Sequence, residues 1–160
     1  MVESTIRSFC VLHVMRMTRP GSLASDLAKR ILAEGVFFPR PTLPRPKGIR
    51  KMGDGACYRN AYLRALTQGW IYCEGIALTS LDVPVQHAWC VMDGDAVVET
   101  TWREAGHGYL GIPMTIKHVA EWALKQRSCG SVLESDWWAA RSSVTKSVTR
   151  RKTDGSRNSL

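Results

Sequence analysis

Hydrophobic residues recur at helical spacing in the first part of the chain. Every fourth residue from Leu23 to Ile31 is apolar, and Gly35 follows at a position where helices commonly end. This pattern predicts a helix over residues 22–34. Residues 5–17 alternate more loosely, and their pattern fits either a strand or a short helix.

A second helix is predicted over about residues 56–68, where apolar residues again follow a helical spacing. Gly53, Asp54 and Gly55 separate it from the preceding segment. Asp54 or Gly55 would cap its N-terminus, and Gly69 stands where a C-terminal glycine is favoured.

Runs rich in aromatic and β-branched residues predict three strands. These are residues 70–78, 87–91 and 96–101. The last two flank a turn at 92–95 and form the clearest hairpin signal. Residues 103–114 contain three glycines and a proline, so we expect a loop there, with a short strand possible over 109–112. Thr115 then caps a third helix, from 116 to about 127.

The predicted order is helix, basic loop, helix, three strands, loop and helix, which is typical of an α+β domain with a mostly antiparallel sheet. A chain of 160 residues and 17.9 kDa, 44% of them hydrophobic, can bury one core. We therefore expect a single domain over residues 1–140. Residues 141–160 are rich in Ser, Thr and Arg and lack aromatic side chains, so they predict a basic, disordered tail.

The formal net charge is +8, but it is divided unevenly along the chain. Residues 1–52 carry +7, residues 53–140 carry −4 and residues 141–160 carry +5. Residues 39–53 are rich in proline and basic side chains, which predicts an extended, positively charged loop. Two interpretations stay open for residues 40–51 and 141–160. They bind an acidic or nucleic-acid partner, or they are merely solvated.

No apolar run approaches the ~18–20 residues that a membrane-spanning helix needs. The acidic start of the chain, with no small-residue cleavage site after the apolar residues 9–15, is untypical of a secretory signal. We therefore expect a cytoplasmic protein without a membrane partner. The five cysteines form no CxxC pair and show no zinc-site spacing, so we expect neither a metal nor an organic cofactor.

Cys57 differs from the other cysteines because it lies in the first turn of the predicted second helix, directly after a glycine-containing loop. Unpaired backbone N–H groups and the helix dipole favour negative charge at such a position. They lower the pKa of a thiol, and the thiolate is its nucleophilic form. The same groups can stabilise an oxyanion. Cys57 is therefore a candidate nucleophile, which needs a base oriented by a third group.

The predicted hairpin supplies the base and the third group in His87 and Glu99. A two-residue turn would pair His87 with Thr100 and point Glu99 to the opposite face of the sheet. A three-residue turn with Gly94 in third place would instead set His87 directly opposite Glu99 on one face. Glycine is favoured at that position, so the sequence predicts a histidine–carboxylate pair.

Four short motifs resemble the transglutaminase-like branch of papain-type cysteine enzymes. They are Gly55-Ala56-Cys57-Tyr58-Arg59-Asn60-Ala61, Tyr72-Cys73-Glu74-Gly75, His87-Ala88-Trp89 and Val97-Val98-Glu99-Thr100-Thr101-Trp102. In that superfamily a helix-borne Cys, a strand-borne His in a His-Ala-Trp context and an acid follow in this order. The chain also resembles small uncharacterised bacterial and phage proteins with a Cys-Tyr-x-Asn-Ala motif. The resemblance covers about residues 53–113.

The resemblance implies an α+β fold of the papain or transglutaminase type, in which a helix bearing the nucleophilic cysteine packs on a small antiparallel sheet. Cys57 matches the nucleophile, His87 the base and Glu99 the orienting acid. Two positions depart from the family pattern, because Glu99 replaces the usual Asp and Thr100 the usual Pro. The acid side chain is therefore one methylene longer here.

Four further residues are candidates for substrate binding. They are Tyr58, Asn60, Gln86 and Trp102. Tyr58 and Asn60 lie in the first turn of the predicted helix, where Asn60 could instead tie down a loop. Gln86 precedes the base, and its side chain and the backbone N–H of Cys57 are candidate oxyanion donors. Trp102 either borders the site or packs in the core.

The expected function is cysteine-dependent acyl transfer on a peptide or carboxamide substrate, through an acyl-thioester intermediate. The enzyme would be a peptidase, an amidase or deamidase, or a transglutaminase, and the breadth of the family favours hydrolysis. Two alternatives stay open. One is a module that binds nucleic acid or an acidic protein through the basic segments. The other is a catalytically inactive transglutaminase-like fold used for binding.

Overall fold

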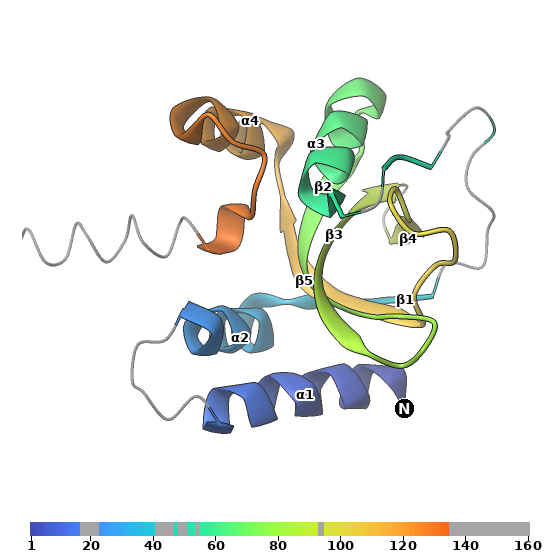
Figure 1. Cartoon of the computed structure of the whole chain (residues 1–160), viewed down its shortest axis with the longest axis vertical. Helices are drawn as coiled ribbons and strands as arrows, with labels where there is room; N and C mark the ends of the chain where they lie inside the picture. The colour runs from blue at the N-terminus through green and yellow to red at the C-terminus, as the bar shows by residue number, and fades with distance from the viewer. Residues whose placement is uncertain (17–22, 41–46, 48–50, 54, 93–94, 135–160) are drawn as a thin grey trace, which may run out of the picture.

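The computed structural model describes residues 1–16, 23–40, 47, 51–53, 55–92 and 95–134. This part of the chain is an α+β structure (Figure 1). In chain order its elements are α1 (Val2–Arg16), α2 (Leu23–Glu34), β1 (Val36–Pro39), α3 (Cys57–Gln68), β2 (Ile71–Leu78), β3 (Pro84–Met92), β4 (Ala96–Val98), β5 (Gly108–Met114) and α4 (Ile116–Gln126). Residues 132–134 form a further helical turn.

The five strands form one antiparallel sheet in the order β1-β5-β2-β3-β4. The sheet is curled, so that its two edge strands, β1 and β4, come into contact. Its inner face carries a small cluster of buried side chains. These are Phe38, Cys73, Ala77, Trp89, Val91, Val97 and Tyr109. The curl therefore gives the inner face an apolar interior of its own, in which Trp89 is the largest fully buried side chain.

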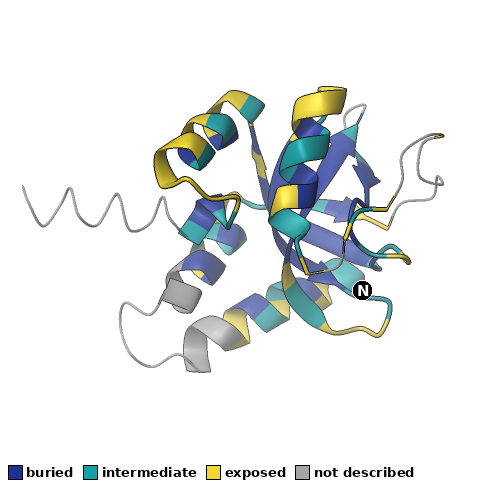
Figure 2. Ribbon diagram, turned by 45° about the horizontal axis from the view of Figure 1, so that its top comes forward, coloured by how far each residue is buried: buried dark blue, intermediate teal, exposed yellow. Residues whose placement is uncertain are grey.

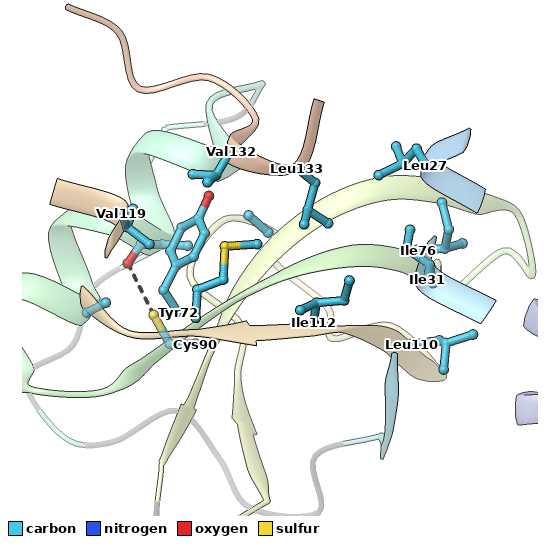
Figure 3. Packing of buried hydrophobic residues seen from close by; sticks show 14 of the residues in the cluster. Leu27, Ile31, Tyr72, Ile76, Cys90, Leu110, Ile112, Val119, Val132 and Leu133 are labelled. Atoms are coloured by element: carbon cyan, nitrogen blue, oxygen red, sulfur yellow. Dashed lines mark hydrogen bonds between the residues drawn. The ribbon is translucent and has the colours of Figure 1, made fainter. Parts of the chain in front are cut away.

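The main core lies between the outer face of the sheet and the helices, whose inward sides are buried (Figure 2). Side chains alternate along a strand, so Tyr72 and Ile76 of β2 face this core while Cys73 and Ala77 face the inner cluster. Figure 3 shows side chains from α2, α4, β2, β5 and the 132–134 turn meeting in the main core. The turn after α4 is thus part of the packed structure.

A pair of glycines opens the inner face at its centre. Gly75 of β2 and Gly111 of β5 are register partners. A Cβ atom on Gly111 would lie 2.5 Å from a ring carbon of Trp89, and one on Gly75 would meet the backbone of β5. Because Gly75 is also the register partner of His87 on β3, no side chain of β2 competes with His87 for the inner face at this position.

The structure confirms the helices predicted over 22–34, 56–68 and 116–127, with ends that differ by only one or two residues. Gly69 ends α3 in the left-handed conformation, with φ of 72°. Thr115 caps α4 by accepting the backbone N–H of His118 at 3.3 Å. Both caps were predicted from residue type alone.

The cap predicted for the start of α3 is wrong in one respect. Ala56, and not Gly55, occupies the N-cap position, and no side-chain capping hydrogen bond is formed there within the described part of the chain. Gly55 instead takes the preceding position with a positive φ of 74°. Asp54 lies outside the described residues. The first N–H groups of α3 are therefore left for other partners, which bears on Cys57.

For residues 5–17 the structure bears out the helix and not the strand: residues 5–16 belong to α1, which is longer than expected and buries Ile6 and Cys10, and residue 17 lies outside the described part. Two strands differ from the sequence prediction. Strand β1 was not predicted. Strand β5 runs from 108 to 114, where a loop with a short strand over 109–112 was expected. The glycines of β5 leave room for side chains of neighbouring elements and do not form a turn. Because glycine usually interrupts a strand, they misled the prediction.

Among the described residues, no helix is long and apolar enough to cross a membrane. The predicted tail at 141–160 and most of the basic loop at 39–53 lie outside the described part. Of the basic side chains of that loop, Arg40, Lys47 and Lys51 are described, and all three are exposed.

Candidate active site

His87 and Glu99 meet on the inner face of the curled sheet. His87 lies on β3, and Glu99 follows directly after the last residue of β4. The Nε2 atom of His87 lies 3.0 Å from Oε2 and 3.2 Å from Oε1 of Glu99. Both side chains are buried, with 2% and 6% of their residue surface exposed. The predicted histidine–carboxylate contact is therefore present.

The register that produces this contact differs from the predicted one. Met92 pairs with Ala96 and Cys90 with Val98, so three residues separate the paired strands. The predicted turn paired Val91 with Asp95, and the observed ladder is shifted by two residues from it. Because side chains alternate with a period of two, this shift keeps Glu99 on the face of His87 but makes the contact diagonal.

Both oxygen atoms of the Glu99 carboxylate accept further hydrogen bonds, besides the contact with His87. Its Oε1 accepts the backbone N–H groups of Thr101 at 2.8 Å and Trp102 at 3.0 Å. Its Oε2 accepts the hydroxyl of Tyr109 at 3.1 Å. Burial works to raise the pKa of Glu99, but the hydrogen bond and charge of His87, with the two backbone groups, outweigh it and hold the pKa below its ordinary value.

The imidazole of His87 is enclosed by aromatic rings. Trp102 stacks on it with ring centroids 3.8 Å apart and an interplanar angle of 13°. Trp89 lies roughly parallel at 6.4 Å. Burial works to lower the pKa of His87, but its hydrogen bonds to Cys57 and Glu99 and their charges outweigh burial, so the pKa is raised. The site therefore favours the protonated imidazole.

Cys57 is the first residue of α3 and forms a hydrogen bond with the side chain of His87. Since Nε2 faces Glu99, Nδ1 is the ring nitrogen left to face the thiol. Burial works to raise the pKa of Cys57, but His87 and the backbone N–H groups of Ala88 and Tyr58 outweigh it, so the pKa is lowered. A thiolate is stabilised here by an imidazolium and by two backbone donors.

The packing of α3 on the sheet fixes where this thiol lies. Ala61 and Ala65 are fully buried, and their small side chains let α3 approach β3 closely. The Sγ of Cys90 on β3 donates to the carbonyl oxygen of Ala61 at 3.2 Å (Figure 3). The β3–β4 ladder ends at Cys90, so the N–H of Ala88 is available to Cys57.

Cys57 is chemically distinct from the buried cysteines of this protein. Burial raises the pKa of Cys10 to about 11 and that of Cys90 to about 12, and it also raises the pKa of Cys73. These three thiols behave as small buried residues, as expected. Cys129 is exposed.

The four predicted substrate-binding residues have different positions. Asn60 is buried, and its Nδ2 donates to the carbonyl of Gly53 at 2.7 Å and to Oγ1 of Thr101 at 3.0 Å, so it joins two loops instead of facing a substrate. The phenol of Tyr58, which is half-buried, forms a hydrogen bond with Ser131. Asn60 therefore has the loop-joining role that was its alternative, and substrate binding by Tyr58 stays a prediction.

Gln86 and Trp102 are both accessible to solvent, and their role in substrate binding stays a prediction. Gln86 is exposed and precedes His87 on β3. By the alternation of the strand it faces the side of the sheet that carries α3. Trp102 is partly exposed, so one face of its ring covers His87 while the rest borders solvent.

Two buried polar residues near the site were not predicted. Tyr109 donates to Glu99 and accepts the N–H of Gly106 at 2.8 Å, but its sequence context predicted only a possible short strand over 109–112 and no partner. Glu74 is buried within the apolar strand β2. An acidic residue inside an apolar run is a usable sequence signal, because a carboxylate is buried only when it has partners.

The described residues contain no group of three or more His, Cys, Asp or Glu side chains that could hold a metal ion. No protein-family model matches this chain, and comparison with curated proteins and with solved structures gives no match. The candidate function therefore has to be argued from the geometry of the site.

Proposed function

We propose that the protein is a cysteine-dependent acyl-transfer enzyme that acts through Cys57, His87 and Glu99. One observation carries the proposal. A thiol at a helix N-terminus is hydrogen-bonded to a buried histidine, and that histidine is held from its other nitrogen by a fully hydrogen-bonded carboxylate. This is the arrangement that nucleophilic catalysis by a thiol requires.

The reaction starts from the thiolate and the imidazolium. The sulfur of Cys57 attacks the carbonyl carbon of a peptide or carboxamide, and the electron pair of the carbonyl bond moves to oxygen. Backbone N–H groups at the start of α3 and on Ala88 stabilise that oxyanion. The carbon–nitrogen bond then breaks, the leaving nitrogen takes the proton of His87, and an acyl-thioester remains on Cys57.

The thioester is resolved by water or by an amine. His87 removes a proton from the incoming group, which attacks the thioester carbon, and the sulfur leaves as thiolate. Water gives a carboxylic acid, as in a peptidase, amidase or deamidase, and an amine gives a new amide, as in a transglutaminase. Hydrolysis is favoured here because of the breadth of the family that the motifs resemble.

Two further features support the proposal. The curled antiparallel sheet with a helix that bears the candidate nucleophile agrees with the fold implied by the resemblance to transglutaminase-like, papain-type enzymes. The dense hydrogen bonding of Glu99 compensates for its departure from the family's Asp, because it fixes a longer and more mobile side chain.

Acyl-enzyme trapping tests this function. The protein is incubated with an activated ester of a short acylated peptide, and the acyl adduct is located by mass spectrometry. We expect an adduct on Cys57 in the wild type, none there in Cys57→Ser, and strongly slowed formation in His87→Ala. Cys129, an exposed thiol, is the internal reference for non-specific acylation. Equal labelling of Cys57 and Cys129, unchanged in His87→Ala, would contradict the proposal.

A further inference from the structure

Glu74 is a second buried carboxylate that the proposed reaction does not use. It lies on β2 with 1% of its surface exposed. Its carboxylate accepts the hydroxyl of Tyr72 at 2.5 Å and the hydroxyl of Ser131 at 2.7 Å. It also accepts the backbone N–H groups of Val132 at 2.8 Å and Leu133 at 3.3 Å. Burial raises the pKa of Glu74 more than these hydrogen bonds lower it. A buried carboxyl group with this many donors is an anchor for the groups that surround it.

The group that Glu74 anchors is the start of the helical turn after α4. Ser131 caps this turn, since its Oγ accepts the N–H of Glu134 at 3.3 Å. The spacing of Ser131 and Glu134 is that of a capping box. Glu74 accepts the next two N–H groups, so the three N–H groups of the turn, which lack helical partners, are all satisfied. Negative charge is favoured at this end of a helix.

The same serine connects this turn to the helix that bears Cys57. Its Oγ donates to Glu74 and forms a hydrogen bond with the phenol of Tyr58, the residue that follows Cys57. The backbone N–H of Tyr58 in turn donates to the sulfur of Cys57. A continuous series of contacts therefore leads from Glu74 through Ser131 and Tyr58 to the thiol.

Glu74 also lies beside the residue that supplies the second donor to the sulfur, on the neighbouring strand. It is the register partner of Ala88, whose backbone N–H donates to Cys57. Tyr58 and Ala88 belong to different elements, α3 and β3, and both must be correctly placed for the two N–H groups to converge. The anchored turn contacts α3 through the hydrogen bond between Ser131 and Tyr58.

We propose that Glu74 and Ser131 are positioning residues for Cys57, which hold the first turn of α3 through the phenol of Tyr58. The turn after α4 is then part of the active site, although it touches no reacting atom. This inference rests on the proposed function, since it concerns how the nucleophile is held. It assigns a role to a segment that lies more than seventy positions after Cys57 in the chain.

The test is the rate of alkylation of Cys57 by iodoacetamide as a function of pH, with the site mapped by mass spectrometry and Cys129 as reference. We expect Ser131→Ala and Tyr58→Phe to move the midpoint upward by about half to one pH unit. Alkylation near pH 6 would then be about three- to tenfold slower. Ser131→Thr keeps the hydroxyl, so its alkylation rate should depend on pH as in the wild type.

Tyr72→Phe is the matched control. It removes a hydroxyl from the same carboxylate, but that hydroxyl lies outside the series of hydrogen bonds that leads from Ser131 through Tyr58 to the thiol. We expect it to lower the melting temperature and to leave the alkylation midpoint unchanged. If Ser131→Ala does not fold, Tyr58→Phe decides the question, because it removes only one oxygen atom.

The outcomes separate this inference from the proposed function. A wild-type midpoint that is low and depends on His87, but does not change in Ser131→Ala and Tyr58→Phe, would overturn the positioning role alone. A shift in Tyr72→Phe as large as that in Ser131→Ala would also overturn it, because general loosening would then explain both. An ordinary thiol profile in the wild type would overturn the inference together with the proposed function.

Discussion

Glu99 reaches His87 diagonally across the β3–β4 hairpin, with Oε2 3.0 Å from Nε2. The observed ladder pairs Val91 with Val97 and Cys90 with Val98. Continued in the same register, it places position 101 opposite His87 and Glu99 opposite Trp89. A diagonal neighbour lies farther away than a directly opposed one. The additional methylene of a glutamate spans this greater distance.

This geometry predicts that Glu99→Asp is not a conservative change here. The shorter side chain cannot reach His87 and keep the backbone N–H groups of Thr101 and Trp102 together. We expect acyl transfer in Glu99→Asp to fall by about tenfold or more, which corresponds to roughly 1.4 kcal/mol of lost transition-state stabilisation. The measurement is kcat/KM for an activated ester. An activity equal to that of the wild type would show that the diagonal contact is not needed.

The pH dependence of stability should reflect the same carboxylate. The folded-state pKa of Glu99 lies below its ordinary value of 4.5. Its contribution to the free energy of unfolding is therefore present above that pH and is lost as the pH falls through the folded pKa. Glu99→Gln should destabilise the protein by about 2 kcal/mol at neutral pH, with a smaller difference in acid. Urea unfolding of the wild type and Glu99→Gln, from neutral to acid pH, measures this difference in stability. A difference that does not change with pH would contradict the assignment.

The contribution of His87 to stability depends on pH in the opposite direction. Its folded-state pKa is raised above 6.5, so its contribution is present below that pH and is lost as the pH rises through the folded pKa. In Glu99→Gln, the loss of the carboxylate removes a cause of this shift. We expect the imidazole to titrate at lower pH in the variant than in the wild type, as observed by NMR of its ring protons. An unchanged titration would show that Glu99 does not hold the imidazolium.

Tyr109 should affect His87 through its hydrogen bond to Glu99. Tyr109→Phe removes one donor from the carboxylate and leaves the N–H of Gly106 without its acceptor. We expect a loss of about 1–3 kcal/mol in the free energy of unfolding. The imidazole of His87 should also titrate at a lower pH than in the wild type, because Glu99 is less well held. A stability loss with no change in that titration would assign Tyr109 a packing role only.

Asn60 should support the loop before Cys57. Asn60→Ala removes the donor to Gly53 and Thr101, so we expect a loss of about 1–3 kcal/mol and slower acylation of Cys57. Arg59→Ala is the matched control, since Arg59 is exposed and adjacent in the same turn. It should stay within about 0.5 kcal/mol of the wild type. Equal effects of the two substitutions would contradict the role of Asn60.

Much of the site could be predicted because its chemistry is local in sequence. Cys57 was identified from its place between a glycine loop and an amphipathic helix, and His87 from its place in a strand. The face shared by His87 and Glu99 was also predicted, although the register was not. An error of two residues in register does not change the face, whereas an error of one would have reversed it.

The remaining contacts depend on distant packing and left weaker signals. Residues 103–114 were expected to form a loop with at most a short strand over 109–112, because glycine and proline usually interrupt strands. In the structure Gly111 makes room for Trp89, and the strand β5 runs over 108–114. The contact of Tyr109 with Glu99 joins β5 to the end of β4, a strand that is not its neighbour in the sheet, and no local pattern indicates it. Apart from Tyr72, the partners of Glu74 lie 57 to 59 positions away, which no local pattern reveals.

The thiol pKa of Cys57 tests the central claim most directly. Iodoacetamide alkylation is followed against pH in the wild type and in His87→Ala, with Cys57 mapped by mass spectrometry. A thiolate–imidazolium pair predicts rapid alkylation below about pH 7 that is lost in the variant. An ordinary thiol profile with a pKa of about 8.5, the same in both proteins, would contradict the account.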